Sequence, residues 1–357
     1  MKITKRIEKE EERYLEIKNR LMNYFKLIKS SNNSGQSRDA GFCYGINPIN
    51  KSLIELDRKT LGSPTGFILG TKDNEDTFTA KEEIINAFIN TNDDIIIIDP
   101  TGQYDRLVTN LGGEIINICN KSSSNINPFE ISLHPHYESN CPPIDKYAFI
   151  INLYNYLIPT GRELNSKNRD IIETILNELL ADYDKSSFQG DPPTIKDFYN
   201  KLKGSKDTKI LADILDIFIK EKSNMFNSKT NIKINNRVNS FNISKFDKKL
   251  QPLVMLLTLE YIWDRSVGKL MKEHDGDTKK RGWIYINKID TLFNANKEAD
   301  YLYQIYRLSR PQGIMLTGVT HNVEPMLETD TGSSMICNSD FIQTTNQAYT
   351  VEKSCLI

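Results

Sequence analysis

The sequence has few cysteines and histidines and no long apolar run. Its five cysteines are scattered, odd in number and without metal-ligand spacing, which favours a reducing cytosol over a disulfide framework. His134 and His136 form one H-x-H pair without a second cluster of ligands, so we predict no metal site. No run of about 18 apolar residues is present, so no membrane-spanning helix is expected. The charged N-terminus also lacks the apolar stretch of a signal peptide.

The sequence also lacks an excess of positive charge. Its 357 residues include 46 Lys and Arg against 47 Asp and Glu, so no global field attracts nucleic acid. Two local basic clusters interleaved with Tyr and Phe leave a nucleic-acid-binding module without ATPase activity open as an alternative. A solvated surface of a lysine-rich protein is the other interpretation. The clusters are Lys201, Lys203, Lys206 and Lys209, and Lys245, Lys248 and Lys249.

Strand and helix patterns alternate along most of the chain. Short apolar segments such as 66–70 and 94–99 are typical of buried parallel strands, and 52–57 is expected to be a further short strand. Amphipathic segments such as 77–90 and 250–272 predict the intervening helices. This order predicts a three-layer α/β fold with a mainly parallel sheet. The expected parts are a charged N-terminal helix and linker at 1–40, a first core part at 41–144, an all-α insertion at 145–230 and a second core part at 231–357.

A phosphate-binding loop is present in outline but altered in its chemistry. The working motif reads G-x-x-x-x-G-K-[ST], in which glycine amides and a lysine face the phosphates. Gly70 and Thr77 match its ends, whereas Glu75 replaces the second glycine and Asp76 replaces the lysine. We therefore predict a vestigial nucleotide site that consists of Gly70, Thr71, Lys72, Asp73, Asn74, Glu75, Asp76, Thr77 and Asp99.

The two acidic substitutions have a direct electrostatic consequence. Like charges about 4 Å apart repel by roughly 1 kcal/mol in water and by about 4 kcal/mol at an effective dielectric constant near 20. Glu75 and Asp76 should therefore disfavour a polyphosphate. The same carboxylates at a helix N-terminus would each offset the helix dipole by about 0.3–1 kcal/mol. We expect them to fill the vacant anion position with the protein's own negative charge.

Several motifs together, in order and at the matching spacing, resemble a known family of motors. The chain is similar to the motor domain of the conjugative-transfer and type IV secretion ATPases, in the HerA–FtsK group of hexameric P-loop ATPases. The resemblance covers roughly residues 41–348 and implies a RecA-like core. Relative to the family, the chain is expected to be truncated at both ends, which disfavours an independent motor. The segments that carry the resemblance are Cys43–Asn47, Leu61–Gly70, Ile95–Tyr104, Ile126–Pro128, Asn224–Arg237, Trp263 and Thr317–Asn322.

The resemblance also implies roles for positions outside the loop. Asp99 matches the aspartate that follows the second strand of the family. Asn287 and Lys288 stand where the family has an Asp-Glu pair that holds Mg²⁺ and orients the attacking water. His321 replaces a glutamine that senses the γ-phosphate, and Arg310 matches an arginine of the subunit interface. No catalytic position is expected to be intact.

These substitutions predict a catalytically inactive ATPase-like scaffold or regulatory subunit of a conjugation or secretion system. An active ATPase that uses Lys72 with ATP and Mg²⁺ is the alternative, as is a decayed reading frame; otherwise no cofactor is expected. The resemblance implies partners among the transfer proteins, including an active homologous ATPase. Nucleic acid remains an open partner. The expected location is the cytoplasm, with peripheral association at the inner face of the cell membrane as a further alternative.

Overall fold

The computed structural model describes most of the chain after residue 40. The described residues are 41–47, 49–70, 75–119, 124–131, 146–158, 164–186, 190–204, 208–220, 226–272, 281–293 and 299–345. Several expectations lie outside them: the N-terminal helix within 1–40, the loop residues Thr71, Lys72, Asp73 and Asn74, and the pair His134 and His136.

The chain divides into two units, residues 1–57 and 58–357. In the first unit, strands β1 (Phe42–Ile46) and β2 (Leu53–Leu56) form an antiparallel hairpin with its own two-stranded sheet. The strand expected at 52–57 is therefore present, but it pairs locally and does not join the parallel sheet. A short turn between the strands allows this antiparallel pairing, whereas a parallel pair needs a long crossover.

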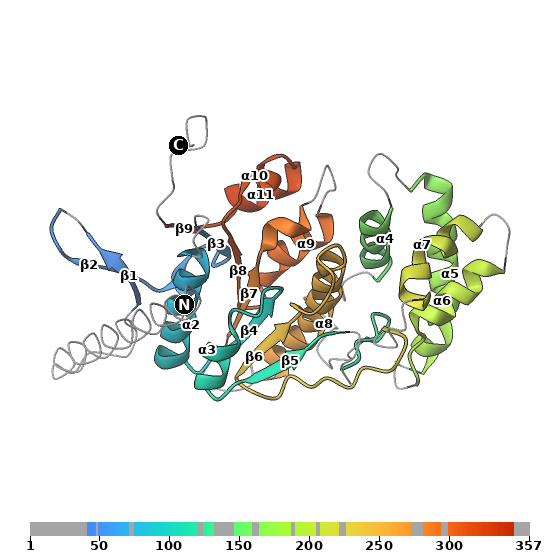
Figure 1. The fold of residues 1–357 in the computed structure, drawn as a ribbon, viewed down its shortest axis with the longest axis horizontal. Helices are drawn as coiled ribbons and strands as arrows, with labels where there is room; N and C mark the ends of the chain where they lie inside the picture. Colours follow the sequence, from blue (N-terminus) through green and yellow to red (C-terminus); the bar gives the residue numbers. More distant parts are fainter. Residues whose placement is uncertain are drawn as a thin grey trace, which may run out of the picture. The chain divides into compact units, whose positions relative to one another are not determined.

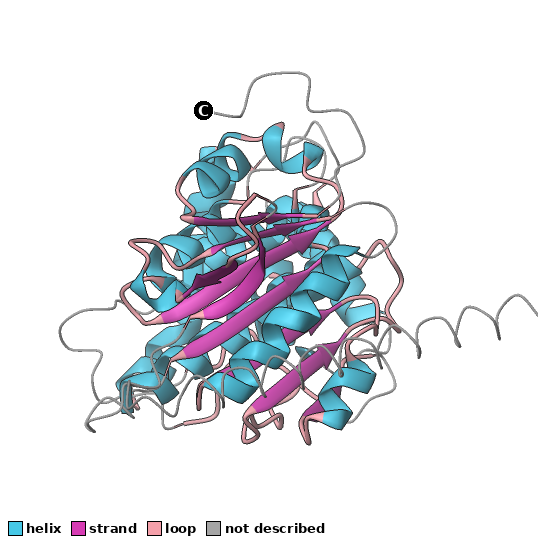
Figure 2. Cartoon of the chain, turned by 90° about the vertical axis from the view of Figure 1, so that its left-hand side faces the viewer, coloured by secondary structure: helices cyan, strands magenta, loops and turns pink. Residues whose placement is uncertain are grey.

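A seven-stranded parallel sheet forms the centre of the second unit (Figures 1 and 2). Its order is β5-β6-β4-β7-β8-β3-β9, and every neighbouring pair is parallel. Its central strands are fully buried, because helices cover both faces. The strands are β3 (Gly66–Leu69), β4 (Asp94–Asp99), β5 (Glu114–Asn117), β6 (Val238–Asn242), β7 (Gly282–Asn287), β8 (Ile314–Thr320) and β9 (Phe341–Thr344).

Helices complete the three layers. Helices α2 (Glu75–Asn90) and α3 (Asp105–Asn110) cover one face of the sheet, and α8 (Gln251–Lys272) and α9 (Asp300–Ser309) cover the other (Figure 1). This placement follows from right-handed crossovers, because the chain crosses the sheet in opposite directions in its two halves. Short helices α10 (Glu324–Leu327) and α11 (Asp330–Cys337) connect β8 to β9.

Between β5 and β6, the described residues form four helices, of which α4 packs against α8 and α9. The predicted fold class, a three-layer α/β domain with an all-α insertion, is thus confirmed, whereas the expected domain boundaries stay predictions. Among the described helices, none combines the length and apolarity of a membrane span. The insertion consists of α4 (Lys146–Leu157), α5 (Ser166–Lys185), α6 (Ile195–Lys203) and α7 (Lys209–Lys220).

Candidate functional site

The described residues of the altered loop, Gly70 and 75–77, and their expected partners lie where four parallel strands end. The register places Asp99 at the end of β4 beside Asn287 at the end of β7, because Ile98 pairs with Ile286. The amide of Gly70, which follows β3, donates to the Thr320 carbonyl at the end of β8, over 2.9 Å. The carboxyl edge of a parallel sheet is the usual place for ligands in such folds.

Asp76 is completely buried in the first turn of α2. Its Oδ1 accepts a 2.7 Å hydrogen bond from its neighbour's amide, that of Thr77. A Cβ atom on Gly70 would lie 2.4 Å from the Asp76 nitrogen, so only glycine fits at the end of β3. Helix α2 begins at Glu75, two residues before the expected start, because acidic residues are favoured in a first turn.

Asp99 is fully buried and stabilises the turn that follows its own strand. Its Oδ1 accepts from the Thr101 amide at 2.9 Å, the Thr101 hydroxyl at 2.7 Å and the Gly102 amide at 2.9 Å. Its Oδ2 accepts from the Tyr104 amide at 2.9 Å. Gly102 has a φ of 73°, which favours glycine. The carboxylate that the family resemblance assigns to the nucleotide site thus serves a local turn.

Thr77 and Asn287 extend the same hydrogen-bond network. The Thr77 hydroxyl donates to Gln103 Oε1 over 3.1 Å. Asn287 is buried, and its Nδ2 lies 3.0 Å from the Thr101 hydroxyl and 3.4 Å from Asp99 Oδ1. These polar groups therefore bind one another across the ends of β4 and β7.

Lys288 contacts two other substituted positions. Its Nζ lies 2.6 Å from His321 Nδ1 and 4.0 Å from Asp76 Oδ2. Asp290, two residues further on, instead accepts from the Thr320 hydroxyl at 2.6 Å. The structure thus brings Asp76, Lys288 and His321 together, although Asp76 lies in the first turn of α2 and the other two follow β7 and β8.

Arg310 does not join this cluster. It follows α9 and precedes β8, and its carbonyl accepts from the Gly313 amide at 3.1 Å. Gly313 in turn contacts Gly282 at the start of β7. Arg310 therefore lies at the amino edge of the sheet, about 20 Å from the carboxyl edge along the seven-residue strand β8. Its assignment to a subunit interface stays a prediction.

Tyr104 is a buried member of the site that the sequence analysis did not single out. Burial raises the pKa of the Tyr104 hydroxyl well above its ordinary value, and the nearby carboxylates of Asp99 and Asp76 raise it further. The Lys81 ammonium lies 5.5 Å from the centre of the Tyr104 ring. Lys81 thus packs on an aromatic ring one turn into α2. The only sequence signal for Tyr104 is its place at the end of the turn that starts at Asp99.

The residues present fit a nucleotide polyphosphate poorly. Asp76 Oδ2 and Asn287 Oδ1 are buried acceptor atoms without a hydrogen-bond partner among the described residues. Acceptor oxygens repel phosphate oxygens, and the ammonium of Lys288 competes with Mg²⁺ for Asp76. Among the described residues, no group of three or more His, Cys, Asp or Glu side chains could hold a metal ion.

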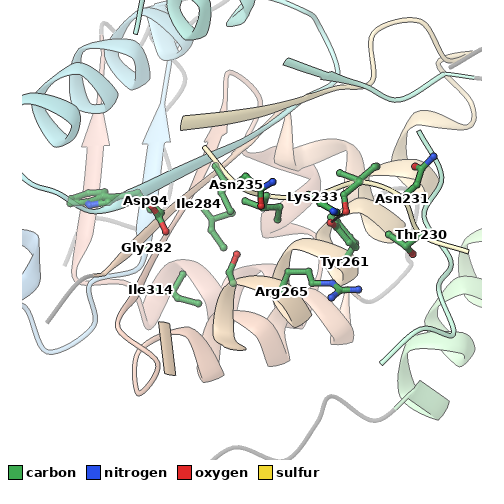
Figure 3. Close-up of a pocket in the computed structure, with 15 residues that line it drawn as sticks. Asp94, Thr230, Asn231, Lys233, Asn235, Tyr261, Arg265, Gly282, Ile284 and Ile314 are labelled. Carbon is green, nitrogen blue, oxygen red and sulfur yellow. Dashed lines mark hydrogen bonds between the residues drawn. The ribbon is translucent and has the colours of Figure 1, made fainter. Parts of the chain in front are cut away.

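A separate cavity of about 530 Å³ lies at the opposite, amino edge of the sheet (Figure 3). Asp94 and Gly282, the first residues of β4 and β7, mark that edge. The extended segment 230–235 and the side chains of Tyr261 and Arg265 from α8 form its other walls. The cavity therefore does not belong to the cluster around Asp76.

Comparison with known proteins gives a match in structure only. No protein-family profile matches the sequence, and no curated protein matches it. The structure of VirB4 of Thermoanaerobacter pseudethanolicus aligns with a TM-score of 0.69 and 18% identity, over 87% of this chain and 85% of that one. The chain has the VirB4 fold.

Plasmid coupling protein TrwB has a related fold. Its structures in complex with ADP and Mg²⁺, and with the non-hydrolysable ATP analogue ADPNP, each align with a TM-score of 0.51 and 12% identity. Each alignment covers 85% of this chain and 74% of TrwB. The fold that the motif order predicted is therefore confirmed.

Proposed function

We propose that this protein is a catalytically inactive, ATPase-like subunit of a conjugative-transfer or type IV secretion system. Its fold is that of VirB4, and its motifs follow the order of that ATPase family. The observation that carries the proposal is the fully buried carboxylate of Asp76 at the position of the phosphate-binding lysine. A scaffold or regulatory role fits these features, because the fold of the motor is present while the charges of its nucleotide site are reversed.

The second half of the site supports the same proposal. A motor of this type needs a carboxylate after β7 to orient the attacking water. Lys288 stands there, and an ammonium group only donates hydrogen bonds, so it offers no acceptor for a proton of the attacking water. Asn287 lacks the negative charge that holds Mg²⁺ and already donates to the turn after β4. The site therefore lacks both the lysine that would bind phosphate and the carboxylate that would activate water.

A DNA-transfer ATPase with residual ATP binding is the second candidate. The TrwB structures that share this fold contain ADP with Mg²⁺ or an ATP analogue. This candidate requires another cation at the phosphate position, and Lys72 is the one that the sequence offers. The expected partners under either candidate are other components of the transfer machinery, including an active ATPase of similar fold, at the inner face of the membrane.

A titration with Mg-ATP separates the two candidates. The melting temperatures of the natural chain and of the double variant Glu75→Gly, Asp76→Lys are measured with increasing Mg-ATP. A ligand that binds only the folded state stabilises it by about 2.7 kcal/mol at 100 times its Kd. We expect no shift for the natural chain and a rise for the repaired variant.

A control for the Asp76→Lys exchange is Asp213→Lys on the exposed side of α7, which makes the same change of charge at a remote position and should leave the response to Mg-ATP unchanged. A shift in the natural chain, together with ATP hydrolysis that is lost in Asn287→Ala, would overturn the proposal. Loss of that shift in Lys72→Ala would then assign phosphate binding to Lys72.

A further inference from the structure

We propose that Asp76 and Lys288 form a charge-reversed ion pair that holds the carboxyl edge of the sheet together in place of a nucleotide. The inference rests on the proposed function, since it assumes a site without bound nucleotide. It assigns a role to Lys288, which the loss of a catalytic glutamate alone does not explain.

The geometry joins three separate elements. Asp76 belongs to the first turn of α2, Lys288 follows β7 and His321 follows β8. The Lys288 ammonium lies 4.0 Å from Asp76 Oδ2 and 2.6 Å from His321 Nδ1. One side chain therefore connects the start of α2 to the loops that follow the two strands.

Relative to the family that the chain resembles, the charges at positions 76 and 288 are both reversed in sign. The family resemblance places a lysine at the position of Asp76 and a glutamate at the position of Lys288. Exchange at only one position would leave two like charges in contact, whereas exchange at both restores attraction. The negative end of the pair then stands where a phosphate would bind. Pairing is thus retained while polyphosphate binding is disfavoured.

Because Asp76 is buried, its pairing with Lys288 is important for stability. The Asp76 side chain is 0% exposed and that of Lys288 is 19% exposed. A buried charge that loses its partner destabilises a protein strongly, because its desolvation is no longer compensated. Asp76 Oδ2 has no hydrogen-bond partner among the described residues, so the ammonium of Lys288 supplies its counter-charge.

The backbone at Lys288 is consistent with a residue held by its contacts. Its φ is 57°, a left-handed conformation that is uncommon for residues other than glycine. The turn is fixed because the Lys288 carbonyl accepts from the amide of Thr291 at 3.0 Å and from its hydroxyl at 2.8 Å. The ammonium donates to His321 Nδ1, which requires that nitrogen to carry no proton.

A charge-exchange cycle tests the pair. Thermal unfolding is measured for Asp76→Lys, for Lys288→Asp and for the double exchange. Each single variant should lower the Tm by about 5 °C or more, because it leaves a buried charge opposite a like charge. The double exchange should recover at least half of the summed loss. A double variant whose loss equals the sum of the single losses would show that the two residues do not pair.

Milder variants keep the test decisive if a charge exchange prevents folding. The cycle is then repeated with Asp76→Asn, Lys288→Met and their combination, where non-additive Tm changes again report pairing. The control is the exposed pair Lys185 and Asp182, whose side chains are 75% and 94% exposed. Exchange of these two charges should leave the Tm within about 1 °C.

Titration of the same proteins with Mg-ATP distinguishes the two proposals. The double exchange retains Glu75 and should therefore still give no shift with Mg-ATP. If the cycle is additive and the natural chain gives no shift, the proposed function stands and the ion pair is refuted. If the natural chain gives a shift, the nucleotide-replacing role of the pair fails, and the proposed function fails as well when ATP hydrolysis that is lost in Asn287→Ala accompanies the shift.

Discussion

At the residue scale, a buried arginine holds the sheet against the helix that carries Asp76. The Arg58 Nη1 donates to both carboxylate oxygens of Glu83 in α2, at 2.9 and 3.1 Å, and to the Thr317 hydroxyl in β8, at 2.8 Å. Its Nε donates to the Pro64 carbonyl at 3.1 Å. The guanidinium also lies 4.1 Å from the centre of the Phe341 ring in β9. These contacts fix α2 relative to β8 and β9.

Arg58→Met should lower the free energy of unfolding by about 3 kcal/mol or more, because it removes the cation that pairs with the buried Glu83 carboxylate. Urea denaturation provides the measurement. Arg307→Met, at an exposed position of α9, is the control and should change stability little. Recovery of stability in Arg58→Met, Glu83→Leu would confirm the reason, and an unchanged midpoint in Arg58→Met would contradict it.

The Tyr261 hydroxyl predicts an alkaline dependence of stability. Burial raises its pKa to about 12, from an ordinary value of 10.0. Between these two values the folded chain keeps a proton that the unfolded chain releases, so the stabilisation is complete below pH 10 and is lost as the pH rises towards 12. The loss amounts to about 3 kcal/mol once the pH exceeds both pKa values.

Urea midpoints of the natural chain and of Tyr261→Phe, measured from pH 9 to 11.5, test this dependence. The variant should be less stable at pH 9 by about 1 kcal/mol, because it loses the hydrogen bond to the Ile232 carbonyl. The difference between the two proteins should then shrink as the pH rises. A constant difference would place the hydroxyl in a solvated environment.

At the scale of elements, helix α2 has charged side chains at both of its ends. Helix α2 has Glu75 and Asp76 in its first turn, where the dipole favours negative charge. At its other end, Arg237 donates to the Phe88 carbonyl at 2.8 Å and also contacts the carbonyls of Ala87 and Thr91. Charges of opposite sign at the two ends therefore stabilise the helix, independently of any ligand.

Helix α6 of the insertion allows the contribution of a helix N-cap to stability to be measured. Thr194 and Asp197 form a reciprocal capping box at the start of α6, with the Asp197 carboxylate accepting from the Thr194 amide at 2.8 Å. Thr194→Ala should lower the free energy of unfolding by about 1 kcal/mol, and Thr194→Ser should have little effect. Chemical denaturation compares the three proteins, and equal midpoints would exclude a stabilising cap.

At the scale of the whole molecule, the charge distribution bears on the nucleic-acid alternative. Part of the first basic cluster is already engaged: Lys201 lies 3.0 Å from Glu178, and Lys203 stacks 4.9 Å from the centre of the Tyr199 ring. Lys245 contacts Asn117 at 3.2 Å. With a net charge of −1, the whole chain has no excess of positive charge beyond these local clusters.

We therefore expect no saturable binding of single-stranded DNA below about 100 μM at physiological salt, the range of weak non-specific association. Fluorescence anisotropy with a labelled oligonucleotide at several salt concentrations measures this. Tight binding with a steep salt dependence would favour the nucleic-acid-binding alternative, and its loss in Lys248→Ala, Lys249→Ala would locate the contact.

Much of the fold could be predicted from the sequence, because burial on both faces leaves a strong local signal. The strand expected at 94–99 has the predicted bounds, and those expected at 66–70 and 52–57 agree to within one residue at either end. The pairing of the strand expected at 52–57 with β1 was not predicted, since a short strand gives no sign of its partner. Arg58 and Tyr104 were missed because single polar residues carry no periodic signal.

The sequence by itself determined the order of strands and helices, and hence a parallel three-layer core, because both follow from local patterns of apolar residues and from the handedness of crossovers. It also determined that a carboxylate replaces the phosphate-binding lysine. Only the tertiary structure decided what this carboxylate contacts. The distance from Asp76 to Lys288 and the separation of Arg310 from both depend on strand register and on which edge of the sheet each residue reaches. Such pairings are physical contacts between distant segments, so no local pattern in the chain encodes them.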